Sequence, residues 1–205
     1  MPKNYIFDLF GTLVNQDDSH MTLLKEFFGV SKDIYKKAIR IVINRNNYVD
    51  IKEGFDDLCK LTGKNPDYMD FKLTLDRYKR ESCYVFEDAF YVLETLKERG
   101  SKLGLISNQA VFYEDVIKTT KLNTMFDVIV LSQKVGLLKP EIPIYGLARK
   151  DMNVPLDTIT MVGDNIVKDV ETPIQIGMKA ILIDHYNKHP EYSPRITSLS
   201  ELLSI

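Results

Sequence analysis

Cysteine is scarce in this sequence: Cys59 and Cys83 are the two thiols in 205 residues. Two cysteines do not make a disulfide framework, and their separation does not match a zinc site, so a reducing cytoplasm is expected. No long uninterrupted apolar run occurs, and the first residues lack a signal-peptide pattern, so we expect no membrane association. The three histidines, His20, His185 and His189, form no metal-ligand pattern.

A strong charge of either sign is also missing. The chain has 29 acidic and 27 basic residues and a formal net charge of −2, whereas domains that bind nucleic acid by bulk charge are strongly basic. Neither a Walker-type phosphate loop nor a dinucleotide fingerprint is present, so ATP and NAD are not expected. From these absences we expect the partner to be a small-molecule substrate. They do not indicate the oligomeric state.

The sequence does contain alternating strand and helix patterns. Short, almost continuous apolar runs are typical of strands buried on both faces of a parallel sheet. They lie at residues 4–8, 102–107, 126–132, 158–163 and 178–183. Helical apolar spacing lies between the strands at residues 88–99, 114–121 and 142–151. This order predicts an α/β fold, with a three-layer Rossmann-like parallel sheet and right-handed crossovers.

A purely helical stretch separates the first predicted strand from the rest. Helical spacing occurs at residues 21–28, 32–44, 51–61 and 67–81. We therefore predict an α/β core at residues 1–16 and 88–205, with an inserted helical domain at 17–87. Near the end of the chain, residues 187–195 are polar and predict a loop, and 198–205 predict a short closing helix. Pro173 predicts that the helix around it starts late or kinks.

Chemically active side chains follow the predicted strands. Because ligands bind outside the carboxyl ends of strands in open α/β sheets, these side chains are expected to converge. They are Asp8, Ser107, Asn108, Lys139, Asp164 and Asp169. Carboxylates suit a hard cation such as Mg²⁺, lysine suits phosphate oxygens, and an aspartate can serve as a nucleophile. The set therefore indicates phosphoryl transfer to a carboxylate.

Four stretches in this order carry a resemblance to a known family. They are Phe-Asp-Leu-Phe-Gly-Thr-Leu at 7–13, Ile-Ser-Asn at 106–108, Leu-Lys-Pro at 138–140 and Val-Gly-Asp-Asn-Ile-Val-Lys-Asp-Val at 162–170. The chain resembles the haloacid dehalogenase (HAD) superfamily of hydrolases, in the form that carries a helical cap after the first strand. The resemblance covers essentially the whole chain.

The resemblance implies a magnesium site. Asp8 would be both the nucleophile and a metal ligand, and Phe10 would offer its main-chain carbonyl to the metal. Asp164 would be the second carboxylate ligand. Asp169 would lie behind the metal and orient a metal-bound water, although it could instead only cap the following helix.

The resemblance also implies residues that bind the substrate. Ser107 would donate a hydrogen bond to a phosphate oxygen, and the Asn108 amide could assist. Lys139 would neutralise charge between Asp8 and the bound group and so take part in catalysis. Thr12 would help to hold the loop around the phosphate. Taken one at a time, Ser107 and Asn108 are more typical of a helix cap, and Lys139 is more typical of an exposed loop.

Phe10 departs from the phosphatase pattern. Phosphatases of this family usually carry a second aspartate at that position, which protonates the leaving oxygen, whereas phenylalanine moves no proton. Family members that cleave carbon–halogen bonds have an aromatic residue there and a tyrosine after the lysine, where Tyr145 falls. A metal-independent 2-haloacid dehalogenase is therefore one alternative. A catalytically impaired binding protein on the same scaffold is another.

Asp164 favours the phosphatase, because the family's dehalogenases have neutral residues in place of the Gly-Asp pair. Two carboxylates held close together without a cation would repel each other. We therefore predict an Mg²⁺-dependent phosphatase acting on a small phosphorylated metabolite through an aspartyl-phosphate. Arg40 is the candidate for the arginine that a dehalogenase needs, and Arg45 lies on the same basic face. Such a face is more often simply solvated.

Overall fold

The computed structural model describes residues 3–15, 25–44 and 48–205. These residues form a six-stranded sheet in the order β3-β2-β1-β4-β5-β6, and every pair of neighbouring strands is parallel. The strands are β1 (Asn4–Phe7), β2 (Leu103–Ser107), β3 (Val128–Leu131), β4 (Ile159–Gly163), β5 (Lys179–Ile183) and β6 (Arg195–Ile196). The predicted α/β class with a parallel sheet is confirmed.

The strand order places β1 at the centre of the sheet. The chain passes from β1 to β2 and β3 on one side, and then crosses to β4, β5 and β6 on the other. In such sheets the ligand crevice forms where the strand order reverses, outside the carboxyl ends of the strands. Asp8 is the residue immediately after β1, so the sheet topology alone places it at this crevice.

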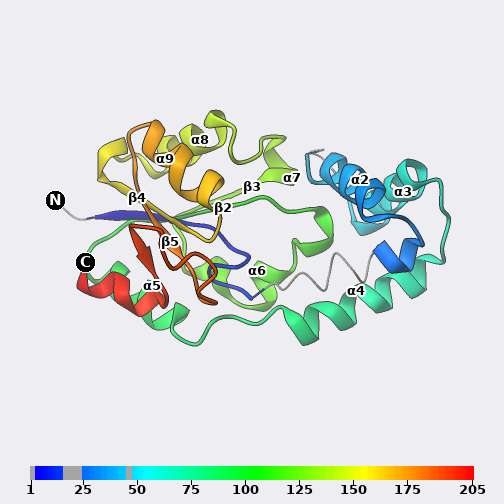
Figure 1. The fold of residues 1–205 in the computed structure, drawn as a ribbon, viewed down its shortest axis with the longest axis horizontal. Coiled ribbons are helices and arrows are strands. Elements are labelled where there is room, and N and C mark those ends of the chain that lie inside the picture. The colour runs from blue at the N-terminus through cyan, green and yellow to red at the C-terminus, as the bar shows by residue number, and fades with distance from the viewer. Residues whose placement is uncertain (1–2, 16–24, 45–47) are drawn as a thin grey trace.

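Helices cover both faces of the sheet (Figure 1). Alternate residues of β1 point to opposite faces: Tyr5 and Phe7 belong to one apolar core, and Ile6 belongs to the other. The first core packs under α5 (Ala89–Glu98) and α6 (Val116–Thr119), and the second under α8 (Ile142–Met152). The short helix α9 (Thr172–Gln175) lies on the α8 side (Figure 1). Both faces are therefore buried, as near-continuous apolar strands require.

Three further helices lie beyond the carboxyl edge of the sheet (Figure 1). We call them the cap helices: α2 (Lys32–Asn44), α3 (Ile51–Thr62) and α4 (Tyr68–Ser82). The side chain of Asp50 accepts a hydrogen bond from the Glu53 main chain and caps α3. Asp67 does the same at the start of α4 by accepting from Asp70. Of the predicted helix at 21–28, residues 25–28 are helical and 21–24 lie outside the described residues.

The cap helices share an apolar core with the sheet domain. Phe55 and Phe71 pack with ring centroids 4.9 Å apart, and Phe71 meets Phe112 of the core at 5.3 Å. A Cβ atom added at Gly54 would lie 2.7 Å from a Val111 methyl carbon, so glycine permits close contact between α3 and the core. These contacts hold the cap helices directly against the segment that follows β2.

Some local predictions were wrong in detail. Residues 187–195 were predicted as loop, but Arg195 and Ile196 form the short edge strand β6 beside β5. Two residues are too short to show a strand pattern. The predicted helix at 114–121 is instead a 3₁₀ turn (Val111–Tyr113) followed by the short α6, and the closing segment (Leu199–Ser204) is also 3₁₀.

The prediction for Pro173 is confirmed, because a π-helical turn (Ile166–Glu171) precedes α9 and Pro173 lies in the first turn of α9. Proline is tolerated there because the first N–H groups of a helix have no intrahelical partner. Among the described residues, no helix is both long and apolar enough to cross a bilayer.

Candidate functional site

A tight turn after β1 presents Asp8. The Asp8 N–H donates to the Val162 carbonyl of β4 at 2.9 Å, so the sheet ladder extends to this residue. Gly11 then adopts φ +79°, and a Cβ atom there would lie 2.4 Å from an Asp164 carboxylate oxygen. Both the backbone conformation and the closeness of Asp164 therefore require glycine. The turn brings the main chain around Phe10 next to the Asp164 carboxylate.

A second glycine makes room for Asp169. A Cβ atom at Gly163 would lie 2.3 Å from the Asp169 carboxyl carbon. The Asp169 N–H donates to the Asn165 carbonyl at 2.8 Å, and the Asn165 N–H donates to Asp169 Oδ2 at 3.1 Å. These bonds fold the segment after β4 over the sheet edge. Asp169 becomes fully buried, whereas Asp164 stays open to solvent at the mouth of the site.

Lys139 contacts both Asp8, in the turn after β1, and Asp169, in the segment after β4. Its buried Nζ lies 2.7 Å from Asp8 Oδ1 and 2.7 Å from Asp169 Oδ1. Burial opposes the charged ammonium, but Asp169 and Asp8 outweigh this cost and raise the pKa of Lys139. Its main chain is held by Asn108, whose side-chain amide donates to the Lys139 carbonyl at 2.7 Å and accepts from the Lys139 N–H at 2.8 Å. Lys139 is thus a fixed positive charge beside Asp8.

Three carboxylates converge beside this lysine. Asp8, Asp164 and Asp169 each have an oxygen within 4.8 Å of the others. Loss of hydration next to the surrounding protein raises the pKa of Asp164 to about 7, and the charges of Asp8 and Asp169 act in the same direction. Burial raises the pKa of Asp169 to about 6, although Lys139 favours its ionised form. Three acids with one bound ammonium leave an excess of negative charge, which a divalent cation would relieve.

The converging side chains line a cavity of about 190 Å³. Its walls are formed by Asp8, Phe10, Ser107, Asn108, Lys139, Asp164, Asn165, Lys168 and Asp169. The structure therefore brings together the residues proposed from the sequence, except Thr12, which is buried in the turn beneath. The hydroxyl oxygens of Ser107 and Thr12 are buried and have no hydrogen-bond partner among the described residues. Of these two, the Ser107 hydroxyl belongs to a residue of the cavity wall and is available to a bound anion.

Lys168 is the lining residue that the sequence did not single out. It lies in the π-helical turn between Asp164 and Asp169, where a lysine is typical of a solvated surface. The signal that could have identified it is its place inside the stretch at 162–170. It adds a second positive charge at the cavity wall.

Two other residues considered for dehalogenation, Tyr145 and Arg40, do not line this cavity. Tyr145 is a completely buried residue of α8 that belongs to the second apolar core, and its hydroxyl donates to the Lys168 carbonyl. Its hydrogen is therefore already used inside the protein. Arg40 lies on the exposed face of α2, as a solvated basic face would. Arg45 lies outside the described residues.

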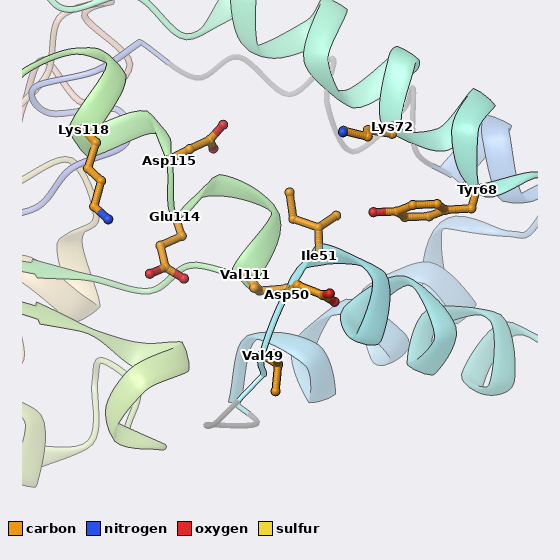
Figure 2. A pocket seen from close by; sticks show the side chains of 9 residues that line it. All are labelled: Val49, Asp50, Ile51, Tyr68, Lys72, Val111, Glu114, Asp115 and Lys118. Carbon is orange, nitrogen blue, oxygen red and sulfur yellow. The ribbon is translucent and has the colours of Figure 1, made fainter.

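A larger cavity of about 380 Å³ lies at the junction between the cap helices and the core. Figure 2 shows Tyr68 and Lys72 of α4 across from Glu114 and Asp115 of the core, with Ile51 between them. This cavity contains none of the residues that converge around Lys139. The side chains expected from the sequence to carry the chemistry, among them Asp8, Lys139 and Ser107, line the smaller cavity.

The donor set of the smaller cavity fits a magnesium ion. Asp8 and Asp164 offer carboxylate oxygens, Phe10 between them in the cavity wall would offer its main-chain carbonyl, and the exposed position of Asp164 admits water. Mg²⁺ binds one or two carboxylates and keeps several waters and phosphate oxygens in its octahedral shell. The residues present would thus leave positions for a phosphorylated substrate.

Stabilisation by Mg²⁺ is expected to increase between about pH 6 and about pH 8. Below the raised pKa of about 7, Asp164 holds a proton that the metal must displace, so apparent affinity falls about tenfold per pH unit. Without metal the sign is opposite, because the folded state favours the protonated acid. Stability of the metal-free protein is lost as pH rises from the ordinary value of 3.8 to about 7.

Thermal unfolding with and without Mg²⁺ across this pH range measures both effects. Asp164→Asn is the matched variant, since it keeps the size of the side chain and removes the titrating ligand. It should abolish the pH-dependent part of the shift. An equal Mg²⁺-induced shift at both ends of the range would contradict a metal bound by Asp164.

A known protein family matches most of the chain, including the residues of this site. The sequence pattern of the haloacid dehalogenase-like hydrolases matches residues 5–183. The chain belongs to the haloacid dehalogenase-like hydrolase family. It is therefore a hydrolase, and the predicted HAD resemblance is confirmed.

Curated relatives of this haloacid dehalogenase-like hydrolase include both phosphatases and dehalogenases. It is 27% identical over 222 residues to the glyceraldehyde 3-phosphate phosphatase of Methanocaldococcus jannaschii, covering 100% of this chain and 97% of that one. It is 26% identical over 194 residues to the (S)-2-haloacid dehalogenase of Pseudomonas fluorescens, covering 89% and 84%. A 127-residue stretch is 31% identical to haloacid dehalogenase-like hydrolase domain-containing protein 3 of Danio rerio, covering 60% of this chain and about half, 52%, of that protein.

Solved structures show the same fold. A HAD phosphatase from Thermococcus onnurineus superposes with a TM-score of 0.72 at 24% identity, covering 98% of this chain and 96% of that one. A HAD family enzyme from Bacteroides thetaiotaomicron, in complex with magnesium and inorganic phosphate, gives a TM-score of 0.72 at 18% identity, covering 90% and 95%. At these identities the likeness concerns the fold, and the choice between activities depends on the residues of this chain.

Proposed function

We propose that this hydrolase is an Mg²⁺-dependent phosphatase that acts on a small phosphorylated metabolite through an aspartyl-phosphate. The observation that carries the proposal is the placement of Asp164 beside Asp8 and Asp169, next to the buried Lys139. A site that displaced halide without metal would gain nothing from this third acid. A divalent cation would offset the negative charge of this cluster and of a bound phosphate dianion.

Asp8 is the proposed nucleophile. One of its oxygens forms a bond to phosphorus while the bond between phosphorus and the ester oxygen breaks. The departing alkoxide takes a proton from water and leaves hydroxide. The oxygen of a second water then attacks phosphorus, its proton passes to that hydroxide, and the bond between phosphorus and Asp8 breaks, which releases phosphate and regenerates the Asp8 carboxylate. Splitting the displacement into two steps lowers the barrier of each. The sheet ladder and Lys139 fix Asp8 in place before substrate binds.

The other residues provide charge and orientation. Lys139, held between Asp8 and Asp169, places its ammonium where a phosphate oxygen would meet the nucleophile. The orphaned Ser107 hydroxyl would donate to a second phosphate oxygen. Asn108 holds the Lys139 main chain with its side chain and so positions the lysine. When bound, Mg²⁺ would be held by Asp8, Asp164 and the Phe10 carbonyl and would supply Lewis-acid stabilisation of phosphoryl oxygens.

Phe10 limits the choice of substrate. Phe10 is one of the residues that line the cavity, and its ring packs edge-on against Tyr113 with centroids 5.7 Å apart, so an apolar residue stands at the position of the missing acid. Positioned acids contribute typically ~10²–10⁴-fold to rate. We therefore propose that good substrates have leaving groups that depart without a proton, such as acyl phosphates.

The second candidate is a metal-independent 2-haloacid dehalogenase. It is favoured by Phe10 and by the relationship to the Pseudomonas fluorescens enzyme. Against it stand Asp164, the occupied hydroxyl of Tyr145 and the outward-facing Arg40. A binding protein disabled by Phe10 is the third candidate. It would retain the orphaned hydroxyls without turnover.

We also propose the division of the chain into a core (residues 1–16 and 88–205) and a cap (17–87) that covers the catalytic cavity. The arrangement of α2, α3 and α4 beyond the strand ends supports it. A cytoplasmic location is proposed because neither Cys59 nor Cys83 forms a disulfide bond, which suits a reducing compartment. Binding of nucleic acid is not expected from the balanced charge.

The test is a panel of phosphorylated metabolites, including acyl phosphates and p-nitrophenyl phosphate, assayed with Mg²⁺ and with EDTA. Phosphate release that requires Mg²⁺ and is fastest for the best leaving groups is the expected result. Chloride release from 2-chloropropionate that is insensitive to EDTA would establish the dehalogenase instead. Inactivity on every substrate would favour the binding protein.

A further inference from the structure

The larger cavity, at the junction of the cap helices and the core, has the size of a ligand site. Its volume of about 380 Å³ falls within the ~300–1,000 Å³ that is typical of small-molecule pockets, whereas the catalytic cavity, at about 190 Å³, is smaller. The two cavities share no lining residue. We call the larger one the junction cavity. A molecule that binds there would leave the catalytic cavity free.

Part of the wall of the junction cavity is apolar. Ile51, the first residue of α3, is partly buried, and Val111 comes from the segment of the core that follows β2. Val49, just before α3, also lines the cavity and is 90% exposed. Covering apolar surface of this kind contributes about 25 cal/mol per Å² to binding. The wall therefore favours a ligand with an apolar body.

Two lysines of the wall are available to an anion. Lys72 of α4 and Lys118 of α6 are exposed, and neither forms a salt bridge with another residue that the structure describes. Tyr68 lies four positions before Lys72 and so shares its face of α4. Figure 2 shows the Tyr68 hydroxyl and the Lys72 ammonium both directed from α4 toward the core, with Lys118 on the opposite side. Cap and core thus each supply one cation to the same cavity.

The acidic side chains of the wall, in contrast, already have partners. Glu114 lies 2.9 Å from Lys134 Nζ, and Asp115 lies 2.6 Å from Lys79 Nζ. Neither of these two lysines lines the cavity. Asp50 accepts a main-chain hydrogen bond at 2.9 Å and caps α3, where the positive end of the helix stabilises its charge. The charges left to interact with a ligand are therefore positive.

We propose that the junction cavity binds a small carboxylate with an apolar body, at a site separate from the catalytic cavity. The carboxylate would accept hydrogen bonds from the Lys72 ammonium and the Tyr68 hydroxyl and would be attracted by Lys118. The apolar body would lie against Ile51 and Val111. Because such a ligand contacts α4 of the cap and the segment after β2 at the same time, its binding would hold the cap helices to the core.

Isothermal titration calorimetry with phenylacetate and phenylacetamide tests the proposal. The two probes have the same ring and almost the same size but differ in charge. At low ionic strength, where exposed charges are little screened, the wild-type protein should bind phenylacetate at least about tenfold more tightly. Lys72→Met keeps most of the length of the side chain and removes its charge. It should weaken phenylacetate about tenfold and change phenylacetamide by less than about twofold.

Lys64→Met is the matched control. Lys64 is an exposed lysine in the loop between α3 and α4, and it does not line the junction cavity. Its replacement removes the same charge from the cap, so the affinity for phenylacetate should change by less than about twofold. Because Lys64 and Lys72 are both exposed, both variants should unfold close to the temperature of the wild-type protein.

Ser107→Ala shows in which cavity phenylacetate binds. Ser107 lines the catalytic cavity alone, so its replacement should not affect a ligand of the junction cavity. The proposal is overturned if the wild-type protein does not bind phenylacetate, or if it binds both probes equally. It is also overturned if Lys64→Met loses as much affinity as Lys72→Met, or if only Ser107→Ala weakens phenylacetate. Calorimetry needs no turnover, so none of these outcomes depends on the proposed phosphatase activity.

Discussion

Replacing Asp8 by asparagine should reduce turnover by at least about 10⁴-fold, whichever of the two hydrolytic reactions the site performs. An amide is a poor nucleophile, and both phosphoryl transfer and halide displacement begin with attack by the Asp8 carboxylate. The substitution keeps the size of the side chain and an oxygen that can accept from Lys139, which lies 2.7 Å from Asp8 Oδ1. Steady-state kinetics on the best substrate of the panel measures the loss.

Folding of the Asp8→Asn variant is the necessary control. Lys139 retains its bond to Asp169 at 2.7 Å, so its buried charge is not left alone. Removal of the Asp8 charge also takes away one cause of the raised pKa of Asp164. The variant should therefore unfold within a few degrees of the wild-type protein. A folded variant that retains activity within tenfold would show that Asp8 is not the nucleophile.

Replacing Phe10 by aspartate should raise the turnover of alkyl phosphates by about 10²–10⁴-fold. The new carboxyl would line the same cavity as Asp8 and Asp164, and like charges nearby raise the pKa of a carboxyl. A raised pKa keeps a proton available near neutral pH, which is what the departing alkoxide needs. The gain should be much smaller for p-nitrophenyl phosphate, because its leaving group departs without a proton.

Phe10→Asn is the matched control for this gain, since it removes the ring without supplying a proton. Both variants lose the edge-on contact with Tyr113, so they should be destabilised to a similar extent. A gain shared by both variants would show that the phenylalanine ring merely obstructs the cavity. No gain in Phe10→Asp, together with chloride release from 2-chloropropionate by the wild-type protein, would instead support the dehalogenase.

Local patterns in the sequence predicted many of the strands and helices of the fold. Apolar runs marked the five longer strands within two residues at each end, and 3.6-residue spacing marked helix α2 at its observed bounds. These signals depend on neighbours in the chain and on whether one or both faces of an element are buried. Strand β6 and the short turns after β2 lacked such signals, because two or three residues show no period.

The candidate site was predicted as a set of residues and not as an arrangement. Asp8, Lys139 and Asp169 are 30 or more residues apart in sequence, and their joint contact depends on the parallel order of β1 and β4 and on Gly163 making room. The outward position of Arg40 and the occupied hydroxyl of Tyr145 also depend on how helices pack onto the core. The type of a residue does not indicate whether its side chain has a hydrogen-bond or ion-pair partner in the folded protein.

The sequence by itself determined the α/β class and predicted the helical insertion and the candidate site residues, because periodicity and short motifs are local properties of the chain. Only the tertiary structure decided that Lys139 bonds two carboxylates at once and that Lys72 and Lys118 line one cavity from the cap and from the core. The physical reason is that hydrogen-bond satisfaction and charge balance are properties of neighbours in space. Those neighbours come from strands, helices and loops that the fold alone brings together.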